Sequence, residues 1–161
     1  MPPSPERTSR SAMDPERLFT LANYAATLGW IILIVAARTR WAAALVTGAI
    51  LPMLFGVIYC GLLAVHFGGS PGGFSTLAGV SAFFANPWLL LAGWVHYLAF
   101  DLFIGSWEVR DAQTSRIPYL ALLPCLILTM MLGPAGLLLY LTVRLVRTRS
   151  LRLDTVPEGL R

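Results

Sequence analysis

The sequence contains few charged residues and no lysine. Only 12% of its 161 residues are charged, and all twelve basic residues are arginines. Soluble domains average about 25% charged residues, so the deficit argues against a water-soluble fold. The arginines lie in the tails and short loops, and the net charge of +4 therefore indicates topology and contacts with lipid headgroups rather than a nucleic-acid partner.

Residues for metal or disulfide chemistry are also scarce. Cys60 and Cys125 fall in apolar runs without CxxC or zinc spacing, which predicts packing residues rather than a disulfide framework. The only histidines are His66 and His96, and His66 is expected at a helix end, so the pattern does not favour a haem held by two axial ligands. There is no metal cluster, phosphate loop or nucleophile triad, and we expect no cofactor.

The chain has four long apolar runs instead. Each approaches or exceeds the roughly 20 residues that a spanning helix needs, and helices satisfy their own backbone in lipid. We therefore predict an all-α polytopic membrane protein, a bundle of four transmembrane helices. The domain covers 14–144, between a disordered tail (1–13) and a basic tail (145–161), and its helices are expected at about 16–37, 41–65, 87–107 and 118–144. A signal peptide is the alternative for the first run.

Proline and helix-capping residues mark the ends of these helices. Asp14-Pro15-Glu16 and Asn86-Pro87 each place a capping residue before a proline at the first helical position. Pro124 and Pro134 fall inside the fourth run, where each predicts a kink. The 66–86 connection predicts either a short interfacial helix or lid, or a plain connector along the membrane.

The arginine distribution predicts the topology. With four helices both tails share one side, and that side would carry eight arginines against four in the other loops. The positive-inside rule then places both termini in the cytoplasm. The first 13 residues are short for a chloroplast transit peptide, so we expect a bacterial cytoplasmic membrane.

Small residues form stripes that predict helix packing in lipid. We expect these stripes to face inward, and large residues such as Leu89, Leu90 and Leu91 to meet lipid or partners. The stripe of the second helix is Ala44, Gly48, Pro52, Gly56, Cys60 and Ala64, and that of the fourth is Ala121, Cys125, Thr129, Gly133, Gly136 and Tyr140.

The third run carries two ionisable residues, His96 and Asp101. An ionised Asp at the centre of a spanning helix costs roughly 2.5–3.5 kcal/mol on translocon scales, so such residues usually face a bundle interior or a cavity. His96 lies near the midplane, and Asp101 follows about 140° around the helix. These two are the candidate catalytic residues for acid–base chemistry, and a structural polar network is the alternative. The candidate substrate-binding residues are Trp94, Tyr97, Asn23 and Thr129.

The run GWVHYLAFDLFIGSWEVRD, followed by IPYLALLPCLILTMMLGPAGLLLYLTVR, resembles the ABA4-like family of four-helix membrane proteins. The resemblance covers 86–144 and extends to 16–35. It implies carotenoid chemistry, in which an epoxide-bearing end group isomerises to an allenic one through an acid, a base and no redox cofactor. His96 and Asp101 are chemically suited to those roles. Ser106 stands where many relatives carry a basic residue.

Two function classes follow from this resemblance. The first is a membrane isomerase of the neoxanthin synthase type, acting on a carotenoid or another isoprenoid lipid. The second is a non-catalytic protein for pigment or lipid binding or for assembly. The expected partners are this isoprenoid lipid and the surrounding membrane lipids, and a homo-oligomer is left open.

Overall fold

The computed structural model describes residues 14–35 and 49–149. Every regular element in these ranges is a helix, which confirms the all-α fold class. The predicted tail 1–13, residues 150–161 of the predicted C-terminal tail, and the first part of the predicted second helix lie outside the described residues. The elements are α1 (Pro15–Val35), α3 (Leu51–His66), η2 (Phe67–Gly69), α4 (Leu77–Phe84), α5 (Pro87–Thr114), α6 (Tyr119–Leu132) and α7 (Pro134–Thr148).

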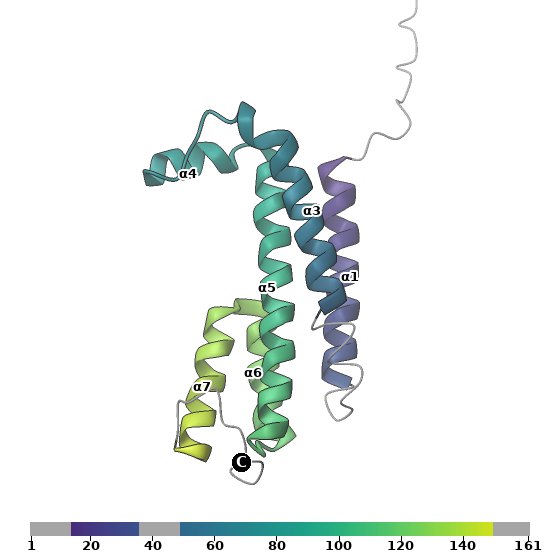
Figure 1. Ribbon diagram of the computed structural model, residues 1–161, viewed down its shortest axis with the longest axis vertical. Coiled ribbons are helices and arrows are strands. Elements are labelled where there is room, and N and C mark those ends of the chain that lie inside the picture. Colours follow the sequence, from purple (N-terminus) through teal and green to yellow (C-terminus); the bar gives the residue numbers. More distant parts are fainter. Residues whose placement is uncertain (1–13, 36–48, 150–161) are drawn as a thin grey trace, which may run out of the picture.

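Within the described residues, three helical stretches are long and apolar enough to cross a membrane. They are α1, α3 continued by η2, and α5. Helix α5 lies at the centre and contacts α1, α3, α4, α6 and α7 (Figure 1). The chain is therefore an all-helical membrane protein arranged around one long helix.

Close packing joins α1 to α5. Trp30 and Leu33 of α1 are buried, and a Cβ at Gly105 of α5 would lie 2.6 Å from the Trp30 ring. The absence of a side chain at Gly105 thus lets the indole lie directly against the α5 backbone.

Helix α5 also runs to Thr114, past its predicted end at 107. This extension places Glu108 and Asp111 on a helix rather than in a loop.

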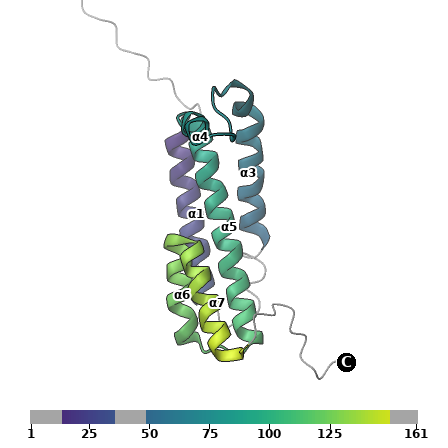
Figure 2. The same cartoon turned by 90° about the vertical axis from the view of Figure 1, so that its left-hand side faces the viewer.

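The fourth predicted helix is wrong as a single element. The chain reverses at Gly133, whose φ of 40° and ψ of −93° interrupt the run, and Pro134 begins a new helix. Helices α6 and α7, of 14 and 15 residues, lie side by side as a hairpin against one half of α5 (Figures 1 and 2). At 1.5 Å per residue each is only about 21–23 Å long, shorter than the hydrocarbon core.

This hairpin changes the expected topology. Helix α1 begins at one end of the bundle and α7 ends at the other (Figure 1). The prediction that both tails share one side required four spanning helices, and a hairpin that returns to its own end does not provide the fourth crossing. The side of the membrane on which each terminus lies stays a prediction.

The small-residue stripe of α3 does not face the bundle. Cys60 and Ala64 are exposed, and a Cβ at Gly56 would meet nothing within 4 Å. Helix α3 instead buries Phe55 and Leu62, because large side chains fill the space beside α5. The inward prediction was therefore wrong here; Ala44 and Gly48 lie outside the described residues.

The stripe predicted for the fourth run does face inward. Cys125, Thr129, Gly133, Gly136 and Tyr140 are all buried between the hairpin and α5. The prediction for three large residues of α5 was wrong in part, since Leu90 is exposed whereas Leu89 and Leu91 are buried.

The 66–86 connection forms a short helix, as one of the two predictions stated. The Thr76 side chain caps α4 by accepting from the Gly79 amide at 3.0 Å. Phe83 of α4 is buried against Phe67 and Phe74, with ring centroids 5.5 and 4.9 Å away. Helix α4 projects sideways at the end of the bundle where α5 begins (Figure 1).

Candidate functional site

The predicted site residues lie around α5 but face three different surroundings. His96 points to α3, Trp94 and Tyr97 border a cavity beside α1 and α4, and Asp101 faces the α6–α7 hairpin. We describe these three regions in turn.

His96 lies in an apolar groove between α3 and α5. Its imidazole is exposed, 5.3 Å from the Tyr59 ring and 4.5 Å from the Phe100 ring between centroids. Two cavities, of about 390 and 680 Å³, share His96 and Tyr59 in their walls, and we call them together the His96 groove. Among the described residues that line the groove, only these two have side-chain nitrogen or oxygen atoms.

The rest of the His96 groove is aliphatic or aromatic. The smaller cavity borders α4, and the larger cavity follows the small residues of α3. The other residues that line the smaller cavity are Leu63, Phe67, Phe74, Phe83, Phe84, Leu89, Ala92 and Gly93. Those that line the larger cavity are Ala49, Pro52, Met53, Gly56, Ala99, Phe100 and Phe103.

A second cavity, of about 620 Å³, lies between α1, α4 and α5. Trp94 and Tyr97 line it, and the Trp94 indole Nε1 donates to Oδ1 of Asn23 at 3.1 Å. Asn23 in turn donates to the Phe19 carbonyl at 2.9 Å. The structure therefore brings together three of the four predicted substrate-binding residues, and we call this cavity the Trp94 groove.

Asp101 is separated from His96. It is only 5% exposed, and a Cβ at Gly133 would lie 2.6 Å from its Oδ1 atom. Neither cavity that His96 lines is also lined by Asp101, since five residues place the two side chains about 140° apart around a helix. Asp101 is thus buried in the bundle interior, whereas His96 is exposed but lines two apolar cavities, so each residue has one of the two surroundings expected for an ionisable residue of a spanning helix.

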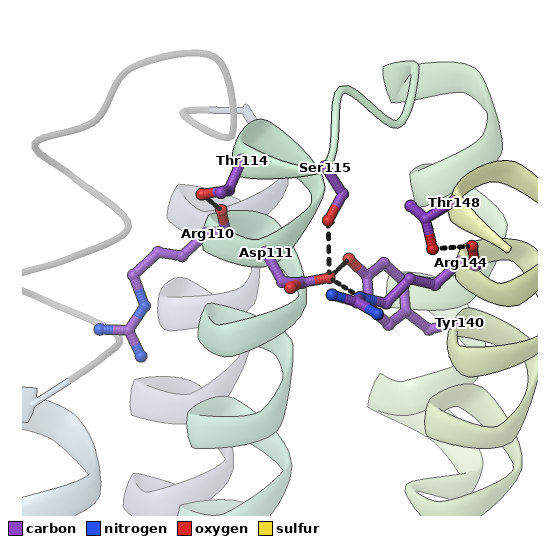
Figure 3. A network of polar contacts seen from close by, with 7 residues as sticks. All are labelled: Arg110, Asp111, Thr114, Ser115, Tyr140, Arg144 and Thr148. Atoms are coloured by element: carbon purple, nitrogen blue, oxygen red, sulfur yellow. Dashed lines mark hydrogen bonds and ion pairs between the residues drawn. The ribbon is translucent and has the colours of Figure 1, made fainter. Parts of the chain in front are cut away.

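The fourth predicted binding residue, Thr129, belongs to a buried network that the sequence reasoning missed. Its hydroxyl donates to Glu108 at 3.0 Å. One turn further, Oδ2 of Asp111 accepts from the Tyr140 hydroxyl at 2.6 Å and from Arg144 Nε at 2.7 Å (Figure 3). Glu108 and Arg144 are 0% and 1% exposed.

The spacing of α5 could have revealed this network. Asp101, Glu108 and Asp111 stand at intervals of seven and three residues, which places them on one helical face. The sequence reasoning missed the network because it ends the third helix at 107, which leaves Glu108 and Asp111 in a loop, and because it places Arg144 at the last position of the fourth helix, where no partner is evident from the sequence. Arg144 balances the charge of the buried Asp111, so the loss of either residue alone would leave an unpaired buried charge.

The class of the protein follows from this geometry: an all-helical membrane protein with a central helix, two apolar grooves and a half-length hairpin. A family model described as ABA4-like, ABA DEFICIENT 4-like, matches residues 17–140, and the chain belongs to this family. Neither the curated proteins nor the solved structures provide a match to this chain.

Proposed function

We propose that the protein binds a carotenoid-type isoprenoid lipid in the His96 groove and isomerises its polar end group. The observation that carries the proposal is the pairing of His96 with Tyr59 where two apolar cavities meet. Family membership adds support, because the resemblance implies carotenoid chemistry.

The groove suits such a ligand in size and character. Its two parts, about 390 and 680 Å³, each fall in the range of roughly 300–1,000 Å³ that is common for ligand pockets. The apolar walls favour a polyene chain, and the few polar atoms in the middle can fix one oxygen-bearing end group.

The chemistry needs one acid and one base. Opening an epoxide adds a proton to its oxygen, while a proton leaves the carbon chain, so the net change is an isomerisation without a redox cofactor. An imidazole exchanges protons near neutral pH, and a tyrosine hydroxyl can donate to an oxygen. We therefore assign His96 and Tyr59 to this step, and the sequence-based pairing of His96 with Asp101 is replaced because Asp101 faces the hairpin.

The test compares the two histidines of the chain. His66 stacks on Trp88 with ring centroids 5.0 Å apart and lines neither part of the His96 groove. In membranes of a carotenoid-producing host, His96→Ala should lower conversion by about 100-fold or more, while His66→Ala should keep it. Bound pigment is extracted from the same preparations. Equal conversion by both variants would show that His96 takes no part in the reaction.

A non-catalytic pigment-binding role is the second candidate. The observation that favours it is that, among the described residues of the groove wall, only His96 and Tyr59 have side-chain nitrogen or oxygen atoms. In that case the purified protein should retain pigment without converting it, and His96→Ala should retain the same amount. Gly56→Leu, which adds a large side chain to the groove wall, should then reduce the bound pigment.

A further inference from the structure

The hairpin face of α5 contains a carboxyl group with an unused oxygen. Oδ2 of Asp101 is buried and has no hydrogen-bond partner among the described residues. One ion pair is found between described residues, and it joins Arg144 to Asp111. Within the described part of the chain, a charged carboxylate at the Asp101 position would therefore have no counter-ion, which the interior of a membrane protein disfavours.

The turn of the hairpin lies directly against this carboxyl group. Helix α6 ends and α7 begins at Gly133, next to Oδ1 of Asp101. The end of a helix leaves backbone carbonyls without intrahelical donors. A protonated carboxyl group can donate to such carbonyls, whereas a carboxylate cannot.

Tyr97 connects this buried group to a cavity. It lies one helical turn before Asp101, and a spacing of four residues puts the two side chains on the same face of α5. Tyr97 also lines the Trp94 groove. The side chain of Tyr97 therefore links an accessible apolar cavity to the helical face that carries the buried carboxyl group.

We propose that Asp101 is a proton-exchange site of the protein interior, and that its proton moves to and from the Trp94 groove through the Tyr97 hydroxyl. On uptake, the Tyr97 hydroxyl gives its proton to the Asp101 carboxylate and takes another from a hydronium ion that enters the Trp94 groove, which leaves a water molecule there. On release, the Tyr97 hydroxyl gives its proton to a water molecule in the groove and takes the proton of the Asp101 carboxyl group. No electron moves and no bond to carbon changes. The Trp94 groove thereby has a proton donor that is independent of His96.

The titratable groups on the elements that pack against this part of α5 either carry the same charge as Asp101 or are engaged elsewhere. On α5 the next acid is Glu108, which would add a like charge. Cys125 of α6 interacts with Glu108, and Tyr140 of α7 donates to Asp111. Arg144 is engaged by Asp111 at 2.7 Å. Helix α1 faces α5 with Trp30 and Leu33, which do not titrate.

Infrared spectroscopy of the full chain in liposomes tests the site. At neutral pH the wild type should show the carbonyl band of a protonated carboxyl group. Asp101→Asn should remove that band and Asp101→Glu should shift it, while Glu108→Gln should leave it in place. A wild type without the band, or an Asp101→Asn variant that keeps all of it, would overturn the proposal.

Deuterium exchange of the same band tests the route. Tyr97→Phe should slow its exchange by about tenfold or more, because the relay hydroxyl is lost. Tyr24→Phe is the matched control, since the exposed Tyr24 of α1 lines none of the three cavities and its loss should leave the rate unchanged. Equal exchange rates in the two variants would refute the route through Tyr97.

Discussion

The two sides of α5 use polar residues in different ways. On the hairpin side, Glu108 and Asp111 are buried and accept hydrogen bonds from α6 and α7. On the α3 side, His96 is exposed in an apolar groove and makes ring contacts. From this comparison we infer that a polar residue of a membrane helix is a candidate for ligand binding or catalysis when it lines a cavity. It is a candidate for stabilising the fold when it is hydrogen-bonded to neighbouring helices.

Among the tests of this comparison, the removal of Arg144 should have the largest effect on the free energy of unfolding. Arg144→Leu should leave Asp111 buried without its ion-pair partner and lower the free energy of unfolding by about 3–5 kcal/mol. Thermal unfolding in detergent measures the effect. Arg147→Leu is the control, because Arg147 lies on the same helix and is exposed. Similar losses in both variants would contradict a stabilising network.

The hairpin contact comes next in size. A Cβ at Gly136 would collide with the Thr129 backbone, so Gly136→Ala should destabilise the protein by about 1–3 kcal/mol. Gly56→Ala should be close to neutral, because the space beside Gly56 is open. Unfolding midpoints of the two variants in the same detergent decide the matter; a larger loss at Gly56 would show that α3 packs through its small stripe after all.

A smaller loss is expected when the Thr129 hydroxyl is removed. Thr129→Val keeps the shape but deletes the donor to Glu108, which should cost about 1 kcal/mol, as for other interhelical hydrogen bonds in membranes. Thr142→Val is the control, since the exposed Thr142 donates only to the Leu138 carbonyl of its own helix. Chemical unfolding of both variants provides the values, and indistinguishable values would mean that the Glu108 contact adds no stability.

The smallest effect on stability should come from the α3 side. His96→Ala should change the free energy of unfolding by no more than about 0.5 kcal/mol, because the imidazole is exposed and outside the buried core. The same unfolding measurement applies. A loss as large as that of Arg144→Leu would make His96 a structural residue and would end the contrast between the two sides.

The sequence predicted the positions of most helices and the identity of the central one. Residues such as Pro15, Thr76 and Pro87 begin or cap their helices as local chemistry requires. His96 and Asp101 were found because ionisable residues in an apolar run stand out. Their partners were missed because hydrogen bonds from Tyr140 or Arg144 to α5 join residues that are distant in sequence.

The fourth run shows where a hydropathy pattern is insufficient. An apolar segment of this length is compatible with one spanning helix or with two half-length helices, since both bury the same side chains. Pro134 predicted a kink, and the structure has a complete reversal at Gly133 and Pro134. The difference depends on whether Gly136 can pack against Thr129, which only the folded chain decides.

The sequence by itself determined the membrane environment, the helical class and the family, because apolar length and composition act locally along the chain. The tertiary structure decided which polar residues meet. In the packed bundle His96 and Tyr59 line the same groove, and Asp111 accepts from Tyr140 and pairs with Arg144. Asp101 lies against the turn of the hairpin. These pairings depend on distances across helices, and a one-dimensional pattern does not contain them.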